Sequence, residues 1–114
     1  MTPDYRLKKE KEFNLVFRTG KRLYSDSVSV LYIPYARLKA GFAVGKKHGG
    51  SVKRNRIKRL MRESFRSFIP EISGNYAFVF IPKIKEEYSL EKFRKDMGYI
   101  FRKGGFIKKR CLNL

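Results

Sequence analysis

The stretch KRNRIKRLMRE, residues 53–63, carries two patterns at once. Its apolar residues recur at the three- and four-residue spacing of a helix, and basic residues fill most of the other positions. We therefore predict a helix that has Ser51 as its N-cap, ends before Pro70 and packs one side on a sheet. The residues expected in the apolar stripe are Val52, Ile57, Leu60, Met61, Phe65 and Phe68.

The basic residues of this helix exceed what a solvated surface needs. Four of them recur every fourth residue, where like charges repel by about a few tenths of a kcal/mol per pair, and only Glu63 interrupts them. We expect contacts to phosphate, because the Arg fork bonds phosphate oxygens in a bidentate manner. The amide of Asn55 suits either a sugar hydroxyl or base edge, or the capping of the loop-to-helix junction. The candidate residues are Lys53, Arg54, Asn55, Arg56, Lys58, Arg59, Arg62 and Arg66.

The segments on either side predict a mixed α+β fold. We expect the strands over 27–35 and 38–46 to pair as a hairpin, and the continuous apolar run at 75–81 to form a buried central strand. The order is α-β-β-α-β-α, with one short extra strand near Leu23, and a single domain spans residues 1–114. The remaining expected elements are a helix from about Lys9 to Arg18 and a helix from Ser89 to Gly104.

Composition indicates a polyanionic partner. The 114 residues include 28 Lys and Arg against 10 Asp and Glu, a formal charge of +18. Nucleic acid fits better than a membrane surface, because the basic residues recur along the chain and Trp is absent. No apolar run is long enough to span a bilayer and the N-terminus lacks a secretory signal, so we expect a cytoplasmic protein.

The sequence contains no evident catalytic or metal-binding set. The acidic residues are scattered, and Cys111 and His48 are the only residues of their kinds, which excludes an internal disulfide and a Cys/His metal site. His48 lies in a Gly-rich basic loop without an evident carboxylate partner. We therefore expect no catalytic residue, no metal and no cofactor bound by the protein alone.

Several motifs together resemble one protein family. The stretch 53–63 resembles the Arg-Asn-Arg motif of the protein subunit of bacterial ribonuclease P, and the similarity extends over nearly the whole chain. A Phe-x-x-x-Phe pair before a Gly is present as Phe13, Phe17 and Gly20, and a Val-Gly-Lys-Lys turn at 44–47 precedes the motif helix. Two departures are Ser51, where the family commonly has Ala, and residues 111–114, which match nothing in the family.

The resemblance implies both a fold and a function. The fold is a small α/β sandwich with a left-handed βαβ crossover (the ribosomal protein S5 domain 2-like fold). The function is that of a subunit that joins a catalytic RNA, ribonuclease P RNA, to remove the 5′ leader of precursor tRNA. The holoenzyme is an endoribonuclease that needs Mg²⁺, its active site belongs to the RNA, and no protein partner is required.

The resemblance also implies a cleft that binds the single-stranded leader, since single strands are held by aromatic stacking beside positive charge. From the residues alone, Phe13 and Phe17 fit a core pair equally well, and a register slip of one residue would turn Tyr32 away from the cleft. The residues expected in the cleft are Phe13, Phe17, Tyr32, Lys46 and Lys47.

Two other functions compete with this interpretation. A non-enzymatic RNA-binding protein of ribosomal type would be equally small and basic. A helix-turn-helix DNA-binding protein would need a scaffold helix before residue 53, where the sequence predicts strands instead.

Overall fold

The sheet is organised around β4 (Tyr76–Pro82), a strand of almost entirely apolar residues. In the computed structural model, which describes residues 5–107, β4 pairs with a strand on each side. β2 (Val28–Pro34) runs antiparallel to it and β3 (Lys39–Phe42) runs parallel. β1 (Lys21–Tyr24) pairs with β2, so the strand order is β1-β2-β4-β3. β1 is the short extra strand expected near Leu23.

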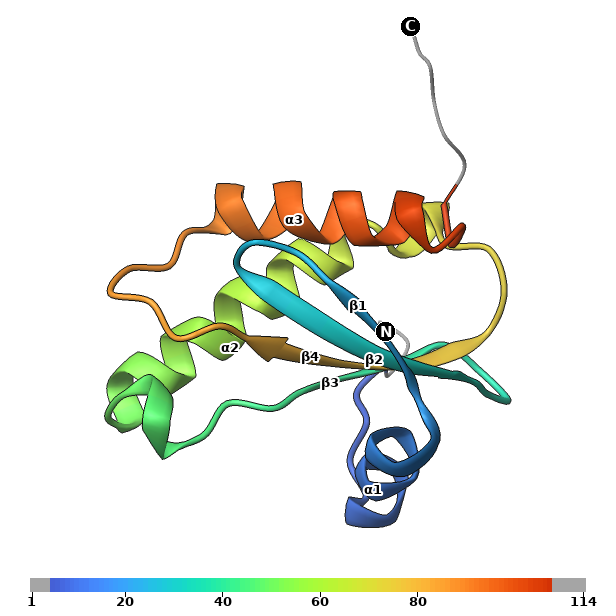
Figure 1. Ribbon diagram of the computed structural model, residues 1–114, viewed down its shortest axis with the longest axis horizontal. Coiled ribbons are helices and arrows are strands. Elements are labelled where there is room, and N and C mark those ends of the chain that lie inside the picture. The colour runs from blue at the N-terminus through green and yellow to red at the C-terminus, as the bar shows by residue number, and fades with distance from the viewer. Residues whose placement is uncertain (1–4, 108–114) are drawn as a thin grey trace, which may run out of the picture.

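Helices cover both sides of this sheet (Figure 1). α2 (Ser51–Arg66) and α3 (Leu90–Lys103) lie on one side, and α1 (Glu10–Thr19) lies on the other. The predicted α+β sandwich is therefore confirmed. Successive residues of a strand point to opposite sides of the sheet, so two cores form. The larger core, under α2 and α3, includes Met61, Phe65, Phe78, Phe80 and Phe101, and the smaller core, under α1, includes Leu7, Val16, Leu31, Ile33 and Val79.

The predicted hairpin between residues 27–35 and 38–46 is wrong. β4 lies between β2 and β3, and the N–H of Tyr35 donates to the carbonyl of Asn75 rather than to β3. β4 is longer than β3 and apolar on both faces. It therefore takes the central position, where both faces are buried. β3 is shorter than expected and lies at the edge, where the extended segment around Arg6 pairs with Ala40.

The connection from β3 through α2 to β4 makes the fold unusual. β3 and β4 are parallel, and α2 crosses between them in a left-handed turn (Figure 1). About 98% of such crossovers are right-handed, so this confirms a feature that the family resemblance implied and that residue spacing could not supply. The crossover places α2 over the edge of the sheet that contains β3.

The helix ends agree with the sequence except at the start of α2. The hydroxyl of Ser89 accepts a hydrogen bond from the N–H of Lys92 and caps α3 as expected. In α2, Gly50 occupies the N-cap and Ser51 is the first helical residue, so the predicted Ser51 cap is wrong. Val52, expected in the apolar stripe, is 83% exposed, because the first turn of α2 extends beyond the end of β4 (Figure 1).

A buried carboxylate ties α3 to the start of β2. Asp96 is 5% exposed, and its Oδ2 accepts hydrogen bonds from both the N–H and the hydroxyl of Ser27. The ammonium of Lys92 lies 3.6 Å from the other carboxylate oxygen. A buried charge that is hydrogen-bonded and paired in this way has a structural role, so Asp96 joins α3 to the start of β2.

Candidate RNA interface

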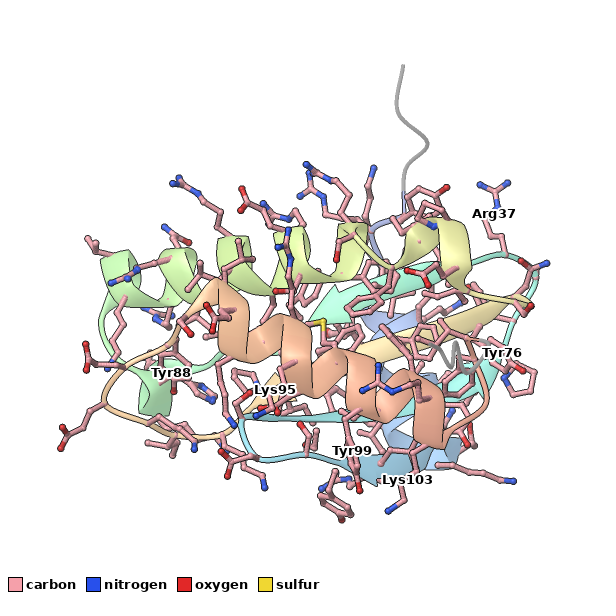
Figure 2. The ribbon with its side chains drawn as sticks, turned by 90° about the horizontal axis from the view of Figure 1, so that it is seen from above. Arg37, Tyr76, Tyr88, Lys95, Tyr99 and Lys103 are labelled. Carbon is pink, nitrogen blue, oxygen red and sulfur yellow. The ribbon has the colours of Figure 1, made fainter. Side chains whose placement is uncertain are left out.

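The basic residues of α2 fall into an exposed and a half-buried group. Asn55, Arg56, Arg59 and Arg66 are exposed, on the side of the helix that faces away from the core. Lys53, Arg54, Lys58 and Arg62 are half-buried on its flanks. Figure 2 shows nitrogen-tipped side chains along the edge of α2 that is remote from α3. The basic residues that recur every fourth position therefore do not share one exposed face, and Arg54 and Arg62 are half-buried, because a four-residue interval drifts around a helix of 3.6 residues per turn.

Arg54 and Arg62 carry charge that no group in the described part of the chain neutralises. The Nε atoms of both are buried and lack a hydrogen-bond partner. Burial lowers the pKa of Arg62, and the positive charges of Arg6, Arg66 and Arg59 lower it further. A buried donor without a partner is costly, by about 1–3 kcal/mol. An anion bound beside α2 would relieve the mutual repulsion of these arginines.

Lys53 has a structural role within the fold. Its ammonium lies 3.5 and 3.4 Å from the carbonyl oxygens of Lys85 and Glu86 and 5.7 Å from the centre of the Tyr88 ring. These contacts hold the loop before α3 against the first turn of α2. The ammonium of Lys53 is consequently less available to an external phosphate than the guanidinium groups further along the helix.

His48 fixes the loop that contains Lys46 and Lys47, the two lysines that the sequence analysis expected in the leader-binding cleft. The imidazole is 3% exposed, with Nε2 2.8 Å from the carbonyl oxygen of Pro82, while the N–H of Gly45 donates to Nδ1 at 3.0 Å. These two bonds require Nε2 to hold the proton and Nδ1 to be free of it. His48 therefore joins the short helix η1 (Lys46–His48) to the end of β4 and has a structural role.

Replacing His48 by Ala is expected to lower the free energy of unfolding by about 1–3 kcal/mol, because it leaves the carbonyl of the buried Pro82 without a partner and removes the hydrogen bond from the N–H of Gly45. Urea unfolding followed by circular dichroism measures this loss. Full stability of the variant would contradict the structural role.

Lys46 and Lys47 are exposed on η1, which contacts the start of α2. In Figure 1, this turn lies at one end of the molecule, whereas α1 lies beneath the middle of the sheet. The two lysines therefore extend the positive surface of α2 past the end of β3. They do not directly flank the Phe pair of α1 as the sequence suggested.

Phe13 and Phe17 occupy different environments on α1. Phe13 is half-buried and packs over Gly41 of β3, where a Cβ atom would lie 2.5 Å from its ring. Phe17, one turn later, is 44% exposed although it is aromatic and apolar. Phe13 thus belongs partly to the smaller core, and Phe17 presents an open ring face beside the sheet.

Tyr32 does not lie in this cleft, which corrects the sequence prediction. Its ring lies 4.8 Å from that of Phe106 and 6.1 Å from that of Tyr76, in the larger core on the opposite side of the sheet. In β2, the alternate residues Leu31 and Ile33 face α1 instead. The register of β2 is therefore shifted by one residue from the register that would have placed Tyr32 beside Phe17.

Tyr24 is an exposed aromatic residue on the side of the sheet that α1 covers, and the sequence analysis missed it. It pairs with Ser29, which pairs with Ile81, and alternation puts all three on the side of the sheet that α1 covers. Tyr24 is 60% exposed, and the guanidinium of Arg22 lies 5.7 Å above its ring. The signal was present in KRLY, residues 21–24, but it becomes usable only once Leu23 is known to face the larger core.

The carboxylates near these surfaces are engaged in hydrogen bonds or ion pairs. A hydrogen bond from the hydroxyl of Tyr35 lowers the pKa of Glu12 and raises that of Tyr35, joining α1 to the end of β2. Hydrogen bonds from Lys92 and then Lys85 lower the pKa of Asp26. Among residues 5–107, no three His, Cys, Asp or Glu side chains are grouped as metal ligands. Cys111 lies outside the described residues.

No helix in the described part of the chain is both long and apolar enough to cross a membrane.

The fold and this surface define a class: a small, basic α+β protein whose crossover helix presents arginines on one side of the sheet, with exposed aromatic residues on the other. The family model described as Ribonuclease P matches residues 1–105. The chain belongs to this family.

Individual relatives agree with this assignment. A ribonuclease P protein component of Clostridium kluyveri is 38% identical over 110 residues, covering 91% of this chain and 97% of the relative. The solved ribonuclease P protein of Thermotoga maritima has a TM-score of 0.76 at 28% identity, covering 85% of this chain and 96% of that one. The Staphylococcus aureus protein shares the fold, with a TM-score of 0.81 at 21% identity and coverage of 93% and 100%.

Proposed function

We propose that the chain is the RNA-binding subunit of a ribonuclease P holoenzyme. In this proposal α2 binds the catalytic RNA, and the cleft between α1 and the sheet binds the 5′ leader of precursor tRNA. The observation that carries the proposal is the arginine-rich surface of α2, where the Nε atoms of Arg54 and Arg62 are buried without a partner. The like charges on this helix repel one another in the free domain, and a bound phosphate chain would offset that repulsion.

The charge distribution supports RNA as that ligand. Seven of the residues from Lys53 to Arg66 are basic, and the formal charge of the chain is +18. Binding to a phosphate chain releases counterions, and Arg groups make bidentate bonds to phosphate oxygens. The exposed amide of Asn55 lies among these arginines and suits a sugar hydroxyl or a base edge.

The aromatic residues on the α1 side support a single strand as the second ligand. Phe17 on α1 and Tyr24 on β1 are both exposed, and the Tyr24 ring already has a guanidinium above it. Unpaired bases stack on such rings, whereas paired bases are shielded within a duplex. The 5′ leader of precursor tRNA is a single strand of this kind. A strand that leaves the cleft along β3 would meet Lys46 and Lys47 next.

The hydrolytic chemistry is proposed to lie on the RNA. Mg²⁺ would be held by RNA phosphates and would supply the activated water there. The protein's own contribution is positioning and charge neutralisation, which raise the affinity for substrate and lower the Mg²⁺ concentration that folding and catalysis need. A cytoplasmic location stays a prediction.

The test is cleavage of precursor tRNA by a bacterial ribonuclease P RNA at low Mg²⁺, with and without the protein. We expect the protein to stimulate cleavage strongly. No stimulation, combined with tight binding to other structured RNAs, would favour the alternative of a non-enzymatic RNA-binding protein of ribosomal type.

The protein without RNA is expected to give no multiple-turnover cleavage, because no described side chains are arranged as a nucleophile, a general base or a metal site. A nuclease-treated preparation incubated with labelled precursor tRNA and Mg²⁺ checks this expectation. Cleavage at the mature 5′ end that survives the removal of all RNA would contradict it.

A further inference from the structure

A recess of about 520 Å³ opens at the C-terminal end of α2, and neither Phe13 nor Phe17 of α1 lines it. Its walls come from the N-terminal segment, the turn between β2 and β3, and the residues that follow α2. Figure 2 shows Arg37, which lines it, at the same end of the molecule as the last turn of α2. This volume falls within the range of about 300–1,000 Å³ that is typical of small-molecule sites.

The lining of the recess combines apolar walls with two polar groups at its edge. Tyr5, Leu38 and Ile72 are half-buried and pack against the larger core, so each presents only part of its surface to the recess. Arg37 and Asn75 are exposed, and their side chains make no hydrogen bond or ion pair with another residue in the range 5–107. Flat apolar contact beside a guanidinium and an amide is the combination that recognises a nucleobase.

The recess also adjoins the positive surface of α2. Arg6 directly follows Tyr5, and the positive charges of Arg6 and Arg66 act on Arg62 closely enough to lower its pKa. Phosphates drawn to the last two turns of α2 would therefore bring the attached nucleotides to the mouth of the recess. This continuity favours a nucleotide within a strand, since a strand places further phosphates on the arginines that lie before the recess.

We propose that the recess lined by Tyr5, Ile72, Arg37 and Asn75 binds one unpaired nucleobase of an RNA strand held along α2. The inference rests on the proposed function and adds a specific base-binding site to it. The base would stack on the Tyr5 ring and contact Ile72, while Asn75 and Arg37 bond its polar edge. A free mononucleotide shares this chemistry but lacks the neighbouring phosphates.

The test follows backbone amide signals of the isotopically labelled full chain by nuclear magnetic resonance during titration with hexaadenylate RNA. We expect saturable shifts at Ile72, Gly74 and Asn75, together with separate shifts around Phe17. Tyr5→Leu should weaken binding at the recess by about fivefold or more and leave the signals around Phe17 unchanged. Arg37→Gln should also weaken it, whereas Arg94→Gln, an identical change at an exposed position of α3, should have little effect.

The outcomes separate the recess from the proposed function. Two outcomes would overturn the recess as a base-binding site and leave the proposed function standing. One is shifts around Phe17 without shifts at residues 72–75. The other is equal RNA binding by the wild type, Tyr5→Leu and Arg37→Gln. Adenosine monophosphate is expected to bind the recess at least about tenfold more weakly than the hexamer. Equal binding of the two would overturn an RNA strand as the occupant and indicate a free nucleotide instead. Loss of all RNA-induced shifts would count against the proposed function itself.

Discussion

Replacing Arg59 and Arg66 together by Glu should lower the affinity for ribonuclease P RNA by about a hundredfold or more. Both side chains are exposed on α2, so the fold does not depend on them. Hydrogen bonds that involve a charged group contribute about 1.5–3 kcal/mol each, and the two carboxylates add repulsion to the lost contacts. The dependence of log affinity on log salt should also flatten by about 1.5, because two fewer phosphates are neutralised.

The matched control is Arg94→Glu with Arg102→Glu, which changes the net charge by the same amount at exposed positions of α3. This variant should lose far less affinity, since its arginines lie on a different helix. Filter binding over a range of salt concentrations measures both variants, and thermal melting checks that each is folded. Equal losses for the two pairs would show that net charge, rather than the surface of α2, determines binding.

Phe17→Leu should weaken the binding of precursor tRNA to the holoenzyme by roughly five- to over a hundredfold, because stacking contributes about 1–3 kcal/mol per base. Leu retains apolar bulk and removes the ring face, and Phe17 is 44% exposed, so stability should change little. The affinity for mature tRNA, which lacks the leader, should stay nearly constant. Tyr24→Leu should act in the same direction.

Two further variants distinguish stacking from packing. Phe17→Tyr keeps the aromatic ring, so this variant should bind the precursor about as tightly as the wild type does, unlike Phe17→Leu. Phe13→Leu should lower stability more than Phe17→Leu does, since the Phe13 ring packs over Gly41 in the smaller core. The contrary outcome is that the affinity for precursor tRNA, divided by the affinity for mature tRNA, is the same in Phe17→Leu as in the wild type. Leader binding would then depend on charge alone.

Much of the fold was predictable because local patterns determine it. The spacing of Ile57, Met61 and Phe65 predicted α2, and the apolar run at 75–81 predicted a buried central strand. The pairing of β2 was not predictable in this way. Residues 27–35 and 38–46 are joined by a short turn, and only the competition of β4 for the central position separates them.

The candidate site was predictable in residue type but less so in orientation. The basic residues of α2 follow directly from the sequence, whereas the half-burial of Arg54 and Arg62 depends on how the helix lies over the sheet edge. Tyr32 was placed on the wrong side of the sheet because a strand reverses its two faces with a shift of one residue, and Tyr24 was missed because the face of β1 was not known. That shift is set by pairing across the whole sheet, which no local pattern encodes.

The most direct test of the central claim measures the affinity of ribonuclease P RNA for precursor tRNA with and without the protein, using leaders shortened stepwise from the 5′ end. If α2 holds the RNA while the α1 cleft holds the leader, the protein should strengthen binding of full-length precursors well beyond its effect on mature tRNA. This gain should disappear once the leader is too short to reach Phe17. A gain that is the same for every leader length, mature tRNA included, would contradict the account.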